Sequence, residues 1–126
     1  MKRSVVILTA WLPVILWTTA IFSFSSLPQE SLSDVGIIGA DKFGHVLEFF
    51  VLGALLIKAF LRSFPSLGLK KIVILSILIA SSCAAIDEVR QYFIPTRNAD
   101  IVDFLSDFIG ANIGTIVCAR GMNWRI

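Results

Sequence analysis

The chain has 126 residues, the length of one domain, yet 56% of them are hydrophobic and the mean hydropathy is +0.85. This composition lies outside the range of soluble domains and indicates a membrane protein. The net charge is only +2, and the basic residues are divided among separate short segments rather than gathered in one patch. Such segments are typical of topology determinants, and no nucleic-acid partner is expected.

Four apolar stretches alternate with segments that carry charges, proline, glycine or serine. Each can cross a hydrocarbon layer of about 30 Å once the polar residues flanking the second and third stretches are included. No small-x-small cleavage motif follows the first stretch, so it is expected to remain as a helix. The sequence predicts an all-α, four-helix transmembrane bundle, a single domain over residues 1–126 with helices at about 4–24, 42–62, 70–93 and 100–119.

Charges are distributed unevenly across this four-span arrangement. Both ends of the chain and the segment between the second and third helices carry eight basic residues and no acid, namely Lys2, Arg3, Lys58, Arg62, Lys70, Lys71, Arg120 and Arg125. All nine acidic residues, with Lys42, Arg90 and Arg97, fall on the other side. By the positive-inside rule, both termini are predicted to be cytoplasmic. Cys83 and Cys118 fall near opposite membrane faces, so no disulfide between them is expected.

The second helix begins with polar groups on one side. Asp41 is expected to cap its N-terminus, where a carboxylate accepts free backbone N–H bonds. Lys42, His45 and Glu48 follow at intervals of three residues and share one side of the helix. Glu48 lies about 10 Å deeper than Asp41, and a lone carboxylate at that depth is costly. It is therefore expected to face the bundle interior, with His45 and Lys42 as its nearest partners.

The third and fourth helices each carry a stripe of small and polar residues. On the third helix the stripe runs at helical spacing through Ala80, Ala84, either Asp87 or Glu88, and Gln91. Asn98 or Asp100 is expected to cap the fourth helix. One face of this helix then carries Asp103, Asp107, Gly110 and Gly114. Because small residues let helices approach closely, the acids on the same stripes are expected to lie in helix interfaces.

Three blocks in this order, DKFGHVLEFFVLG, IDEVRQYFIPTR and DFLSDFIGANIG, resemble the VanZ-like family of small bacterial membrane proteins. The similarity covers roughly residues 21–114. The family's pattern runs through Lys42, His45, Glu48, Asp87, Glu88, Gln91, Pro95, Arg97, Asp103, Gly110 and Gly114. This chain departs from it at Thr96, where glycine is usual, and at Asp107, where asparagine is usual.

The resemblance implies a multi-pass protein of the bacterial inner membrane that is surrounded by the lipid bilayer and acts in cell-envelope biology. The best-known member of the family is associated with low-level resistance to the glycopeptide teicoplanin. A role in lowering glycopeptide susceptibility is therefore what the resemblance implies, without a specific reaction or oligomeric state.

The polar residues of the last three helices admit four interpretations. In the first, they form a structural network in which Lys42 and Arg97 neutralise acids. In the second, they form a binding site for an outer-leaflet lipid or peptidoglycan-related ligand, with Arg97 as a forked donor. In the third, the protein is an enzyme in which His45 and Glu48 act as acid and base and aspartates hold a divalent cation. In the fourth, it is an oligomeric ion-coupled transporter. No nucleophile elbow, phosphate-binding glycine loop or HExxH motif supports the enzyme.

These interpretations share one set of residues, expected to form a site that opens at the outer membrane face. The ligand-binding candidates are Lys42, His45, Glu48, Asp87, Glu88, Gln91, Arg97 and Asp103. The catalytic candidates are His45, Glu48, Asp87 and Glu88. The candidate ligands of a divalent cation are His45, Glu48, Asp87, Asp103 and Asp107.

Overall fold

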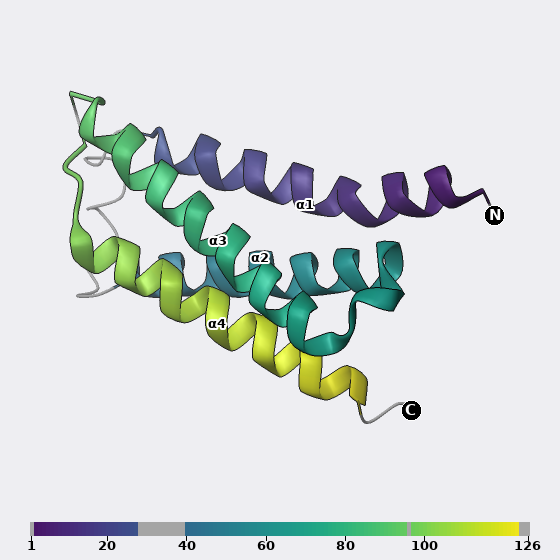
Figure 1. The fold of residues 1–126 in the computed structure, drawn as a ribbon. Coiled ribbons are helices and arrows are strands. Elements are labelled where there is room, and N and C mark those ends of the chain that lie inside the picture. The colour runs from purple at the N-terminus through teal and green to yellow at the C-terminus, as the bar shows by residue number, and fades with distance from the viewer. Residues whose placement is uncertain (1, 28–39, 96, 124–126) are drawn as a thin grey trace.

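The computed structural model describes residues 2–27, 40–95 and 97–123. These residues form four long helices and one short 3-10 turn, and they contain no strand, so the predicted all-α fold is confirmed. The expected loop between the first two helices falls largely outside the described residues, as does Thr96. The elements are α1 (Arg3–Ser25), α2 (Ala40–Ser63), η3 (Pro65–Leu67), α3 (Leu69–Tyr92) and α4 (Ile101–Asn123), drawn in Figure 1.

All four α-helices of the described chain are long and apolar enough to cross a membrane. Large apolar side chains are exposed on their outer surfaces, among them Leu12 on α1, Leu78 on α3 and Ile113 on α4. Within a bilayer these side chains contact lipid instead of water. The prediction of four transmembrane helices is therefore confirmed.

The start of α1 and the end of α4 lie at the same end of the bundle, at the right of Figure 1. At the opposite end α1 finishes, α2 begins, α3 finishes and α4 begins. We call this opposite end, which carries Lys42, His45, Asp87 and Asp107, the polar end. That the termini are cytoplasmic and the polar end is external stays a prediction from the charge distribution.

Glycines bring α2 and α4 into backbone contact. Gly110 lies against the backbone of Val46, and Gly114 lies against the backbone of Phe50. A Cβ atom at either glycine would overlap α2. The close-packed face predicted for the fourth helix is confirmed, and towards the polar end it continues to Asp107, which is fully buried.

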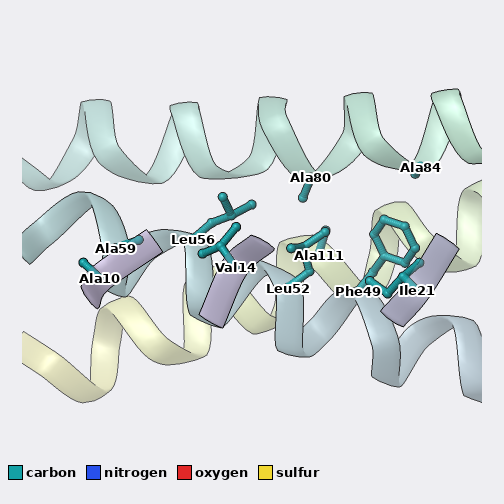
Figure 2. Close-up of a cluster of buried hydrophobic side chains, with 10 residues drawn as sticks. All are labelled: Ala10, Val14, Ile21, Phe49, Leu52, Leu56, Ala59, Ala80, Ala84 and Ala111. Carbon is teal, nitrogen blue, oxygen red and sulfur yellow. The ribbon is translucent and has the colours of Figure 1, made fainter. Parts of the chain in front are cut away.

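The apolar core lies among all four helices (Figure 2). α1 and α2 supply its large side chains, such as those of Ile21, Phe49 and Leu52. The buried members of the same cluster that come from α3 are Ala80 and Ala84. Because these alanines let α3 approach closely, the polar residues farther along its stripe enter the bundle instead of the lipid.

The N-termini of α2 and α4 differ in their first residues. Asp100 caps α4, because its Oδ1 atom accepts the Val102 N–H at 2.9 Å. α2 begins at Ala40, two residues before the predicted start at about 42. Asp41 therefore lies in the first helical turn and not at the N-cap position, and its charge there still complements the helix dipole.

Candidate functional site

Asp87 lies where α3 meets the end of α1, and it is 1% exposed. Its Oδ1 atom accepts hydrogen bonds from the Ser25 hydroxyl at 2.6 Å and from Arg90 at 3.0 Å. Its Oδ2 atom accepts a hydrogen bond from the Gln91 amide at 3.2 Å. We call these four residues the Asp87 cluster. Both carboxylate oxygens of Asp87 have partners, so its negative charge is compensated within the protein.

Arg90 ties the Asp87 cluster to α1. It donates to the Phe22 carbonyl at 2.7 Å and to the Ser26 hydroxyl at 2.5 Å, and it also hydrogen-bonds Ser25. Its guanidinium carbon lies 5.2 Å from the centre of the Phe22 ring, a cation–π contact. The predicted site did not include Arg90, although its i, i+3 spacing from Asp87 is a usable signal.

A second cluster joins α2 to α4. Lys42 forms ion pairs with Asp100, at 2.9 Å, and with Asp103. His45 Nδ1 hydrogen-bonds Asp107 Oδ1 at 2.8 Å, and His45 Nε2 lies 3.8 Å from Asp103 Oδ2. We call these five residues the His45 cluster. The His45 cluster thus extends the close-packed α2–α4 interface of Gly110 and Gly114 towards the polar end.

Glu88 and Glu48 lie beside the His45 cluster. Glu88 Oε2 accepts the Asp100 N–H at 3.0 Å, which links α3 to the cap of α4. The charged groups near Glu48 include those of His45 and Asp107. Among the described residues no ion pair includes Glu48, although the sequence predicted pairing with His45 or Lys42.

Three hydrogen-bond acceptors at the polar end are buried without a partner in the described part of the chain. They are Glu88 Oε1, Gln91 Oε1 and Asp107 Oδ2. Their side chains are 9%, 0% and 0% exposed. A buried acceptor without a donor costs free energy, and such groups are few in native proteins. One buried donor at this end, Arg90 Nε, also lacks a partner, so among the described residues the unpartnered acceptors outnumber the unpartnered donors.

Arg97 contacts backbone rather than carboxylates. It donates to the Leu27 carbonyl at 2.8 Å and to the Phe24 carbonyl at 3.4 Å. These bonds hold the segment after α3 against the end of α1. Its charge lies in the neighbourhood of Glu48, but none of the ion pairs of the described residues includes Arg97.

The candidate cation ligands do not converge on one point. Within residues 2–27, 40–95 and 97–123, no group of three or more His, Cys, Asp or Glu side chains has an arrangement that could hold a metal ion. His45 and Asp107 are instead paired with each other. Cys83 and Cys118 are free thiols, as expected. The polar end presents hydrogen-bonding and charged side chains.

The family model described as VanZ/LLP1 matches residues 5–122. The chain belongs to the VanZ/LLP1 family. No curated protein and no solved structure matches it. With four helices able to cross a membrane, the chain is a multi-pass membrane protein of this family.

The VanZ/LLP1 match spans α1 to α4 and so includes both clusters. The structure gathers all the predicted site residues at the polar end, but it divides them between the two clusters and their surroundings. It adds three residues that the predicted site did not contain, namely Ser25, Arg90 and Asp100. The partner of Ser25, Asp87, lies 62 residues away in the sequence, so spacing within one helix could not place Ser25 in the site.

Proposed function

We propose that this VanZ/LLP1 protein is a binding protein of the bacterial inner membrane that acts in cell-envelope biology. Its polar end faces outwards and binds a donor-bearing group of an outer-leaflet lipid or peptidoglycan-related ligand. Binding of that ligand lowers the susceptibility of the cell to glycopeptide antibiotics such as teicoplanin.

One observation carries this proposal: three buried acceptors, on Glu88, Gln91 and Asp107, have no donor in the described chain. A network that served packing alone would be expected to satisfy its buried groups, in the way that both carboxylate oxygens of Asp87 are satisfied. Ionisable residues within a membrane protein also favour a functional interpretation. A ligand that brings N–H or O–H groups would satisfy these acceptors.

Glu88→Gln tests the proposal because it keeps the shape of the side chain and replaces one carboxylate oxygen by a donor. A strain lacking the gene is complemented with the wild-type protein or with the variant, and teicoplanin susceptibility is measured at equal membrane abundance. The wild type should lower susceptibility, and Glu88→Gln should lose this effect. If Glu88→Gln protects as well as the wild type, the binding site is not at these acceptors.

Thr115→Val is the matched control for the same strain. Thr115 lies on α4, is fully buried and also has an unpartnered oxygen among the described residues, but it belongs to the apolar seam with α2. Removing that hydroxyl should leave both folding and the teicoplanin phenotype unchanged. A loss of protection in this control would point to general destabilisation of the bundle.

A further inference from the structure

A cavity of about 400 Å³ opens between the end of α3 and the start of α4. Val89, Tyr92, Ile101 and Phe104 form most of its apolar wall. Val89, Tyr92 and Ile101 are largely exposed, so the cavity lies on the outer surface of the bundle. We call it the lateral groove. In a membrane its occupant comes from the surrounding lipid, because the side chains beside it are those that face the bilayer.

The lateral groove lies at the level where the helices leave the membrane. α3 ends at Tyr92, and α4 begins at Ile101. Tyrosine prefers this interface, where its ring contacts hydrocarbon and its hydroxyl contacts the headgroups. An occupant of the groove therefore has its headgroup within reach of the polar end.

Glu88 belongs both to the lateral groove and to the set of unpartnered acceptors. It lines the cavity, its side chain is only 9% exposed, and its Oε1 atom has no donor among the described residues. Its Oε2 atom is already bound by the Asp100 N–H. Because Oε1 is buried in the structure, a headgroup reaches it only after a change of the Glu88 side-chain rotamer. The groove thus combines an apolar wall with one carboxylate.

We infer that the lateral groove binds a phospholipid whose headgroup carries a primary ammonium group, with an acyl chain along the apolar wall and the ammonium donating to Glu88. This inference rests on the proposed function, for which it names the class of ligand. An ammonium group supplies N–H donors and a positive charge, both of which the acid-rich polar end accepts. A quaternary ammonium has the charge but no donor, and an anionic headgroup is repelled by Glu88 and Asp100.

The test uses the purified full-length protein in detergent and native mass spectrometry. Dioleoyl phosphatidylethanolamine, phosphatidylcholine and phosphatidylglycerol are titrated separately, so that only the headgroup differs. Phosphatidylethanolamine should bind about tenfold more tightly than phosphatidylcholine, the difference expected for one charge-assisted hydrogen bond. Equal binding of these two lipids to the wild-type protein would overturn the inference.

Two variants locate the binding. Glu88→Gln should make the affinities for phosphatidylethanolamine and phosphatidylcholine equal, because the carboxylate is lost while the apolar wall remains. Ala99→Trp should weaken the binding of all three lipids, because Ala99 is an exposed residue of the groove and a large side chain there fills it. Unchanged lipid binding by Ala99→Trp at an unchanged melting temperature would place the lipid elsewhere.

The outcome is separable from that of the proposed function. If the wild type shows no headgroup preference while Glu88→Gln still abolishes the teicoplanin phenotype, the lipid inference fails and the proposed function stands. If the wild type prefers phosphatidylethanolamine but Glu88→Gln keeps the teicoplanin phenotype, the lipid inference stands and the proposed function fails.

Free ethanolamine serves as a competitor in the lipid-binding experiment. If millimolar ethanolamine displaces the lipid, recognition needs no acyl chain, which contradicts the role of the groove.

Discussion

Two aspartates at the polar end, Asp87 and Asp107, are equally buried but differently satisfied. Asp87 receives donors from three side chains at both of its oxygens. Asp107 is bound by His45 at Oδ1, and its Oδ2 atom has no partner in the described residues. A carboxylate with a full set of donors holds helices together, whereas one with a free acceptor remains available to a ligand. From this comparison we propose a structural role for Asp87 and a ligand-binding role for Asp107.

Replacing each aspartate by asparagine should separate these roles, and this is the largest effect we expect. Asp87→Asn removes the counter-ion of Arg90 and places an amide N–H group opposite side chains that are themselves donors. This should lower the unfolding free energy by about 3 kcal/mol, a value at the low end for a buried pair because Arg90 remains partly exposed. Asp107→Asn keeps the shape and should cost about 1 kcal/mol or less. Unfolding in mixed micelles, followed by circular dichroism, measures both variants.

Asparagine is also the usual residue of the VanZ-like pattern at position 107, which is consistent with a small structural cost there. Equal destabilisation by the two variants would remove the distinction between Asp87 and Asp107. If Asp107→Asn lowered the unfolding free energy more than Asp87→Asn, the roles would be exchanged and the His45 cluster would be the structural one.

The sequence predicted the faces of the helices but not the partners across them. The spacing of Asp107, Gly110 and Gly114 predicts one interface, and the structure has it. Spacing within one helix cannot show which residue of another helix lies opposite, because that depends on the shift and rotation of the two helices. His45 and Lys42 were expected as the nearest partners of Glu48, yet across the α2–α4 interface His45 reaches Asp107 and Lys42 reaches Asp103 instead.

The second prediction concerns the register of α2 against α4. In Gly114→Ala the new Cβ would overlap the Phe50 backbone, so α2 and α4 must separate, which should cost about 1–3 kcal/mol. The separation should also lengthen the contact between His45 and Asp107 and leave the Asp87 cluster intact. Thermal unfolding measures the first effect, and the NMR shift of the His45 ring measures the second.

Gly44→Ala is the control for this substitution. Gly44 lies within α2, and a Cβ there would meet no atom within 4 Å. Because alanine favours helix more than glycine, this variant should be neutral or more stable by about 0.5–1 kcal/mol. Similar losses in both variants would show that close approach at Gly114 does not set the register.

The smallest expected effect belongs to a third, more exposed aspartate, Asp100. The Lys42 hydrogen bond, with that of the Val102 N–H, holds the pKa of Asp100 below its ordinary value. A lowered pKa in the folded state means that the ion pair contributes stability above the ordinary pKa of aspartate, and that this contribution is lost as the pH falls through the folded value.

Asp100→Asn keeps the cap but removes the charge. The difference in unfolding free energy between wild type and Asp100→Asn should therefore be largest at pH 7. It should amount to about 0.5 kcal/mol or less, because the ion pair is exposed. The difference should shrink both in acid and in 1 M salt. A difference that persists at pH 2 would show that Asp100 acts through its shape and not through its charge.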